Sequence, residues 1–311
     1  MKDLRIGFEI NFLIKIGLLF FPVILPGNTD ILEYRQWKGT NGKDLLARLS
    51  GVKDGKLRLK SKNGEMHEIP FSAIDRYDFL YINRYLRSRK KKTIELPYYQ
   101  ISESLRAFIP SLNQSDFGRG RYGIDKTCGP NACVNYLLWW QELGLIQTPI
   151  PKSNSRVSDY LHAKLDRFMS SRTGTNEEGI RRGLEKYFEE YPVKHYNIEI
   201  SRMLFSIEEA TKQCSGSNMV IASLQIIQKN RMSRGGGHWV SLVECDKNGL
   251  VQFNTWGKRF YGRVVPGING GKKIYDIELM QDPGNNFTIG EGSGFVIEES
   301  DIIFVTKLTE K

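Results

Sequence analysis

Polar and apolar residues alternate with a period of two in several short segments near the start of the chain. Such alternation predicts β-strands with one buried face. Glycine-containing turns separate the segments, and Asp54-Gly55 is a strong hairpin signal. The alternating segments are 45–49, 57–60 and 66–69, and a helix-like stretch follows at 78–82. We therefore expect a small all-β barrel over residues 32–87.

The pattern becomes helical after residue 100. Cys133, Tyr136, Leu137 and Trp140 recur at the spacing of one helix face. This helix would begin at Cys128 and end near Gly144. A second helix is predicted over 157–169, and capping-box patterns at 175–178 and 206–209 would open two more.

Strand patterns dominate the last third of the chain. The predicted strands are 196–200, 219–224, 239–244 and 250–253, followed by 295–297 and 302–305 as a closing pair. Helices come first and antiparallel strands later, which indicates an α+β domain over residues 101–311 with its first helix packed on a sheet.

Composition places the chain among folded globular proteins. Its 311 residues suggest about two domains, and hydrophobic residues make up 40% of them. The formal net charge of +10 is uneven, since Arg84, Arg87, Arg89, Lys90, Lys91 and Lys92 lie close together. We interpret residues 88–100 as a basic, solvated linker. The alternative is attraction to a polyanion, but no nucleic-acid motif accompanies the cluster.

The cysteine and histidine spacing gives no sign of a metal site. The four cysteines form no C-x-x-C pair, and we expect no metal and no cofactor. Cys214 and Cys245 would be candidates for a disulfide in an exported protein, but the sequence leaves their pairing open.

The N-terminus has the layout of a secretory signal peptide. An uncharged apolar run at 16–26 follows basic residues and is too short for a standard membrane span. We expect a signal peptide over 1–27, export to the periplasm or beyond, and no stable membrane span after cleavage. The alternative is a buried N-terminal strand.

Three residues far apart in the chain carry the candidate chemistry. Cys128 precedes an apolar helix, whose N-terminus favours a thiolate nucleophile. His238 follows a glycine run and could take the thiol proton, and Asn254 on the next strand could orient its imidazole. Each also has a simpler interpretation: a structural cysteine, a core histidine and a turn asparagine.

Three motifs containing these residues resemble papain-like cysteine peptidases, most closely the bacteriocin-processing, double-glycine-type superfamily. The motifs are Cys128-Gly129-Pro130, Gly237-His238-Trp239-Val240 and Phe253-Asn254-Thr255-Trp256-Gly257. The resemblance implies a catalytic Cys128, a general base His238 and an orienting Asn254. The family's oxyanion glutamine would align with Tyr122, and Gln114 is the nearest upstream glutamine.

The first region resembles the first Sla-homology domain, an SH3-like barrel. The resemblance rests on Arg35-x-Trp37, Gly51-Val52-x-Asp54-Gly55 and Asp78-x-x-Tyr81-Ile82, among other positions. It implies a recruiting module with a protein ligand. The alternative is that this domain is an inert spacer. The expected function is cysteine-dependent hydrolysis of a peptide or protein substrate. The alternatives are an inactive papain-like binding scaffold, or an amidase or acyltransferase.

Overall fold

The computed structural model describes most of the chain after residue 33. It describes residues 34–38, 44–53, 56–74, 76–89, 91, 93–94, 103–117, 126–151, 155–228, 234–269, 272–280, 293–298 and 301–311. The predicted signal peptide, the Asp54-Gly55 turn, Tyr122 and most of the predicted linker lie outside the described residues. No helix in these ranges is both long and apolar enough to cross a membrane.

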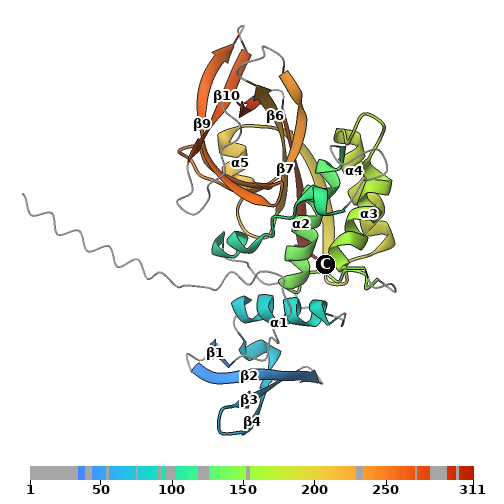
Figure 1. The fold of residues 1–311 in the computed structure, drawn as a ribbon, viewed down its shortest axis with the longest axis vertical. Helices are drawn as coiled ribbons and strands as arrows, with labels where there is room; N and C mark the ends of the chain where they lie inside the picture. The colour runs from blue at the N-terminus through green and yellow to red at the C-terminus, as the bar shows by residue number, and fades with distance from the viewer. Residues whose placement is uncertain are drawn as a thin grey trace, which may run out of the picture.

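The described chain is mixed α+β, with two antiparallel sheets and five α-helices (Figure 1). The first sheet holds β1 (Arg35–Lys38), β2 (Asp44–Lys53), β3 (Lys56–Ser61) and β4 (Met66–Pro70). The second holds β5 (Tyr196–Leu204), β6 (Met219–Gln228), β7 (Arg234–Cys245), β8 (Leu250–Thr255), β9 (Lys258–Asn269), β10 (Lys272–Met280), β11 (Ser293–Glu298) and β12 (Ile302–Glu310). The α-helices are α1 (Arg76–Ser88), α2 (Cys128–Glu142), α3 (Val157–Met169), α4 (Glu177–Glu190) and α5 (Ile207–Gln213), and the 3-10 turns are η1 (Phe71–Ala73), η2 (Glu103–Phe108) and η3 (Gln114–Phe117).

The first sheet has the alternation that the sequence predicts. Its strands follow the order β1-β2-β3-β4, and one face is buried against α1. The buried side chains include Trp37, Leu49, Leu57 and Leu59 from the strands and Phe79 from α1. The expected strands and the helix after them are confirmed, while a closed SH3-like barrel stays a prediction.

Helix α1 lies between the first sheet and the rest of the described chain (Figure 1), and its polar side chains hold the end of α2. Asn83 donates from Nδ2 to the carbonyl oxygens of Gln141 and Glu142, at 3.2 and 3.1 Å. Arg84 and Arg87 both bond to the carboxylate of Glu142, whose side chain is 2% exposed. The expectation of a solvated basic cluster is therefore wrong for Arg87, whose side chain is 20% exposed, whereas Arg84 is half exposed and reaches the same buried carboxylate from the surface.

The second sheet curls so that β6 has two partners along one edge. Its first residues pair with β12 and its last residues pair with β11, which closes β6 to β11 into a ring. The prediction of 295–297 and 302–305 as a mutual pair is wrong, because β11 pairs with β10 and β6 whereas β12 pairs with β5 and β6. Strands β9 and β10 were not expected from the sequence.

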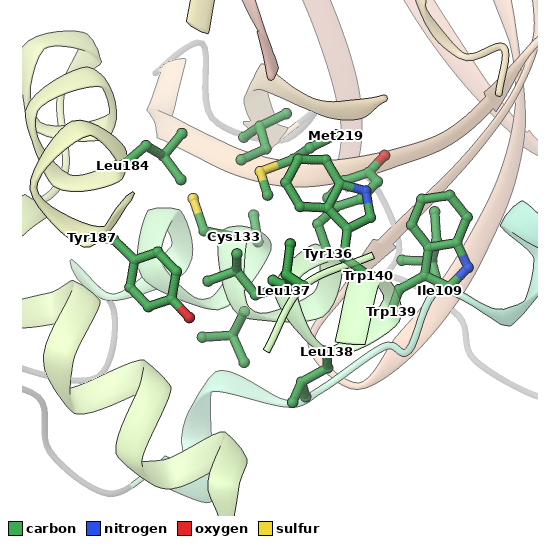
Figure 2. Packing of buried hydrophobic residues seen from close by; sticks show 14 of the residues in the cluster. Ile109, Cys133, Tyr136, Leu137, Leu138, Trp139, Trp140, Leu184, Tyr187 and Met219 are labelled. Carbon is green, nitrogen blue, oxygen red and sulfur yellow. The ribbon is translucent and has the colours of Figure 1, made fainter. Parts of the chain in front are cut away.

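Helix α2 is buried on every side, and it packs on β7, β6 and β8 and against α3. Figure 2 shows Cys133, Tyr136 and Leu137 within the core, with Leu184 and Tyr187 of α4 beside them. Most of its side chains are apolar, as expected of an interior helix, and its buried Asn131 and Asn135 are hydrogen-bonded. The predicted start at Cys128 is confirmed, and Gly144, with a φ of 74°, follows the helix end.

The other helices also form close to their predicted positions. Helix α3 has the predicted bounds, and Ser206 caps α5 by accepting the N–H of Glu209. For α4 the capping residue is Asn176, which accepts from Gly179, and not Thr175 as the capping-box pattern predicts. Both caps satisfy an N–H that the helix itself leaves unpaired.

We expect Gly179→Ala to destabilise the protein by about 1–3 kcal/mol, the usual cost of overpacking. A Cβ atom at Gly179 would lie 2.4 Å from the carbonyl oxygen of Met169, and this backbone atom has little room to move. Urea unfolding of the full chain measures the effect. Gly51→Ala is the control, since a Cβ there meets nothing within 4 Å, and equal stabilities of the two variants would contradict the prediction.

Candidate active site

The thiol of Cys128 lies where the start of α2 meets β7. Cys128 is the first residue of α2 and is 6% exposed. The backbone N–H groups of Trp239, Gly129 and Cys128 itself lie close enough to the sulfur to favour its thiolate form. Since Trp239 directly follows His238, the fold brings the predicted nucleophile next to the predicted base's position on β7.

The thiolate expected from the sequence is contradicted by the burial of this thiol. Burial raises the pKa of Cys128 above its ordinary value, and the three N–H donors lower it only in part. A helix N-terminus stabilises an anion, but removing a charge from water costs more here. The resting group is therefore a neutral thiol.

Alkylation by iodoacetamide is expected to be slower at Cys128 at pH 7 than at a free cysteine in a short peptide. The rate at Cys128 should still be rising at pH values above the pKa of the thiol in the peptide, because only the thiolate reacts and the pKa of Cys128 is raised. Mass spectrometry of the alkylated protein over pH 6–10 measures the rate at each cysteine. A rate at Cys128 that levels off below pH 7 would show a low-pKa thiolate and contradict this assignment.

His238 is held inside β7 by a hydrogen bond and a ring stack. It is 5% exposed, its Nε2 lies 2.6 Å from Oγ1 of Thr255, and its ring stacks on Trp256 at a centroid distance of 4.6 Å. The strand begins at Arg234 and so includes His238, whereas the sequence predicts a strand over 239–244 only. Burial lowers the pKa of His238 to about 4, which keeps the imidazole neutral at pH 7. Because Thr255 lies at Nε2, Nδ1 is the ring nitrogen without a hydrogen bond in the described structure.

Trp256 reaches its place over the imidazole through an unusual backbone conformation. Thr255 pairs with Lys258, so Trp256 and Gly257 form a two-residue turn, with φ values of 48° and 74°. Turns with two positive φ angles suit hairpins, but a bulky residue there is rare. A Cβ at Gly257 would lie 3.0 Å from Cβ of Asn113, so the turn packs tightly on the segment before η3.

Asn254 does not contact His238, contrary to the prediction. Its Nδ2 donates to the carbonyl oxygens of Ile109 and Pro110, at 2.9 and 3.1 Å. Its Oδ1 accepts from Nε of Arg259 at 3.0 Å. The physical reason is strand alternation: Asn254 faces Ser241, whose hydroxyl donates to α2, whereas Thr255, the next residue, faces the opposite side, as His238 does.

Gln114 lies in a segment that the first turns of α2 hold in place. Asn131 donates to the carbonyl oxygen of Leu112 at 2.9 Å, and Asn135 accepts the N–H of Leu112 at 3.1 Å. Gln114, two residues later, is 6% exposed, and its Oε1 has no hydrogen-bond partner among the described residues. Gln114 therefore has a buried, incompletely bonded amide. The oxyanion role that the resemblance implies stays a prediction.

Two residues that the sequence did not single out belong to this region. Thr255 lies between Asn254 and Trp256 in the sequence motif, and only the register of β7 and β8 shows that it faces His238. His162 of α3 stacks on Phe117 at 4.1 Å and lies near the backbone of Thr127, the residue before Cys128, while its Nε2 has no hydrogen-bond partner among the described residues. Its pKa is lowered to about 4, mainly by burial, so it is a neutral link between η3 and the start of α2.

The remaining groups add no metal chemistry to the described residues. These contain no cluster of histidine, cysteine and acidic side chains suited to a metal ion. All four cysteines, including Cys214 and Cys245, are free and buried, so the structure has no disulfide between this pair.

Comparison with known proteins assigns no family to this site. No protein-family model matches the chain, and a search of curated proteins found no match to it. The chemical capacity of the site follows from its own groups: a thiol held by backbone N–H donors, a neutral imidazole and a buried amide. Together these can support nucleophilic attack on a carbonyl and proton transfer to a leaving group.

Proposed function

We propose that this protein is a papain-like cysteine peptidase that hydrolyses peptide bonds through an acyl-enzyme. The proposal is supported above all by the contact between the start of α2 and β7, where Oγ of Ser241 donates to the carbonyl oxygen of Ala132 at 3.0 Å and the N–H of Trp239 lies near the sulfur of Cys128. This contact joins the start of a buried helix to the strand that carries His238, two regions about a hundred residues apart in the chain. A nucleophile and base that meet in this way are typical of cysteine hydrolases.

The proposed reaction begins from a neutral thiol and a neutral imidazole. As the sulfur of Cys128 attacks the carbonyl carbon, Nδ1 of His238 takes the thiol proton and becomes part of an imidazolium. The negative charge moves to the carbonyl oxygen, where the N–H of Cys128 and the amide of Gln114 are the proposed donors. Collapse breaks the C–N bond, and the imidazolium protonates the leaving amine.

Water completes the cycle. His238, neutral again, removes a proton from water as it attacks the thioester, and the thiol leaves with that proton. No cofactor is needed for either half-reaction. Because Cys128 and His238 are 6% and 5% exposed, substrate has to open the site before this chemistry begins. The Trp256 turn, which covers the imidazole, is the element that we propose moves.

The N-terminal sheet is proposed as an SH3-like module that recruits a protein ligand. Its uncovered face carries Leu46 and Met66, both about half exposed, and the buried side is closed by α1. In this proposal the protein is exported, and the module brings the peptidase to its substrate. An inert spacer remains the alternative for this module.

A second candidate function is an inactive papain-like binding scaffold. One observation favours it: in the described structure the side chains of Cys128 and His238 share no hydrogen bond, and burial opposes charge on both. A third candidate, an amidase or acyltransferase, would use the same thiol and imidazole. It differs only in the acyl donor and acceptor.

A peptide library incubated with the full chain tests the proposal. Mass spectrometry should find cleaved peptides, and a peptide aldehyde should form a hemithioacetal on Cys128 that stops cleavage. Ester or simple amide turnover without peptide cleavage would indicate the third candidate. An absence of turnover with every acyl donor, together with no aldehyde adduct at Cys128, would leave the scaffold.

A further inference from the structure

We infer that Thr255, not Asn254, is the residue that positions the imidazole of His238 for proton transfer. This inference rests on the proposed peptidase function. Its starting observation is the 2.6 Å contact between Nε2 of His238 and Oγ1 of Thr255. Thr255 acts through the imidazole and touches no substrate, so it is a positioning residue.

A β-bulge decides which residue of β8 faces the imidazole. Next to the turn that joins β7 to β8, Glu244 pairs with Gln252. Farther from this turn, Leu242 pairs with Phe253, so β7 holds one extra residue, Val243. A shift of one residue turns every later side chain to the other face. Without the extra residue Asn254 would lie on the face of His238. With it, Thr255 lies there.

Arg106 of η2 holds the bulge in place. It is 3% exposed and donates from Nε to the carbonyl oxygen of Val243 at 2.7 Å and from Nη2 to that of Leu242 at 3.0 Å. Tyr136 of α2 donates to the same carbonyl of Leu242. These bonds satisfy two successive carbonyls at the irregular point of the strand. The register beyond the bulge is thereby fixed by buried contacts.

Asn254 is occupied elsewhere. Both ends of its amide are bonded, to the carbonyls of Ile109 and Pro110 and to the guanidinium of Arg259. Arg259 in turn donates to the carbonyls of Ala107 and Ile109. Asn254 therefore fastens the 107–110 segment to the sheet. Turning its amide toward His238 would break all three of its bonds.

A hydroxyl can donate to a ring nitrogen or accept from one, and in the productive tautomer of His238 the hydroxyl of Thr255 accepts. For Nδ1 to accept the thiol proton, the ring hydrogen has to be on Nε2, and Oγ1 of Thr255 is the acceptor beside it. Without this acceptor a buried Nε2–H would be unbonded, which favours hydrogen on Nδ1 instead. A ring with hydrogen on Nδ1 cannot take the proton from that side.

The test compares Thr255→Val with Thr255→Ser, which keeps the hydroxyl. We expect Thr255→Val to lower kcat about 10- to 100-fold with KM nearly unchanged, because a buried donor loses its acceptor. Thr255→Ser should stay close to the wild-type rate. Nitrogen NMR of histidine-labelled protein, with the His238 signal assigned from His238→Gln, should show hydrogen on Nε2 in the wild type and in Thr255→Ser, and a shift toward Nδ1 in Thr255→Val.

Asn254→Ala completes the comparison. It should leave the Nε2–H signal of His238 in place, although its lost bonds to Ile109 and Pro110 lower stability. A wild-type tautomer in Thr255→Val, or a changed tautomer in Asn254→Ala, would overturn the inference. The NMR measurement needs no substrate, so it judges the role of Thr255 even if the protein hydrolyses no peptide. Absent hydrolysis with the expected tautomers would refute only the peptidase proposal.

Discussion

Cys128→Ala is expected to abolish peptide hydrolysis, with a fall in kcat of about 10⁶-fold, as seen when a hydrolase loses its nucleophile. The variant should keep the helix start, since alanine is smaller than cysteine and no side-chain hydrogen bond to the sulfur is seen among the described residues. His238 cannot replace the lost group, because without a nucleophile there is no acyl-enzyme to form. Cleavage of the best library peptide, followed by chromatography, measures the effect.

Cys133→Ala is the matched control for this experiment. Cys133 lies on the same helix, is fully buried, and has its sulfur 4.0 Å from that of Met169. Its loss should cost about 1–2 kcal/mol of stability through a small cavity and leave the rate near that of the wild type. Equal rates for Cys128→Ala and the wild type would refute the proposed mechanism, and a joint loss in both cysteine variants would point to folding instead.

Replacing both Arg84 and Arg87 with alanine is expected to destabilise the protein by about 3–5 kcal/mol at pH 7, the cost of leaving a buried charge unpaired. Burial alone would raise the pKa of Glu142, but Arg87 and Arg84 together lower it below its ordinary value. Glu142 therefore stays ionised in the folded protein, and without the arginines its charge has no counterpart. Urea unfolding of the wild type and the double variant measures the difference.

The same variant should show a characteristic pH dependence. In the wild type the lowered pKa of Glu142 contributes stability above its unfolded value, and this contribution disappears as pH falls through the folded pKa. In the double variant burial is unopposed, so the pKa rises above the unfolded value and protonation relieves the penalty as pH falls. The stability difference should therefore be largest near neutral pH, begin to shrink while the pH is still above about 4.5, as Glu142 of the double variant is protonated, and go on shrinking below that pH as the wild-type contribution is lost.

Glu142→Gln separates charge from shape. The amide keeps the size of the side chain but removes the buried charge, and Arg84 stays partly in water with a side chain that is 52% exposed. Adding Glu142→Gln to the double alanine variant should recover part of the lost stability. No recovery, together with a difference that is constant from pH 4 to pH 8, would mean that the arginines stabilise α2 by packing alone.

Local patterns determined much of the fold. The start of α2 at Cys128, the bounds of α3 and the cap at Ser206 follow from short stretches of sequence, because helix periodicity and capping depend on residues within one or two turns. The alternating strands of the first sheet follow for the same reason. The N-cap of α4 is Asn176 and not the neighbouring Thr175 that the pattern predicts, since several polar residues there compete for the same N–H groups.

Strand pairing was harder to predict than the strands themselves. The two last strands were expected to pair with each other, but β6 lies between them and takes β12 at its start and β11 at its end. Hydrophobic alternation marks a strand without saying which edge it joins. The partner is chosen by the packing of the whole sheet.

For the candidate site, too, some features follow from local sequence and others only from the tertiary structure. Sequence alone predicted the start of α2 at Cys128 and a strand beside His238, because both have local motifs, and it proposed Gln114 only as the nearest upstream glutamine. Only the folded chain decided the charge on Cys128, because burial depends on everything packed around the thiol. Only the folded chain chose Thr255 over Asn254, because one extra residue in β7, held by a distant arginine, sets which side chain of β8 faces the imidazole.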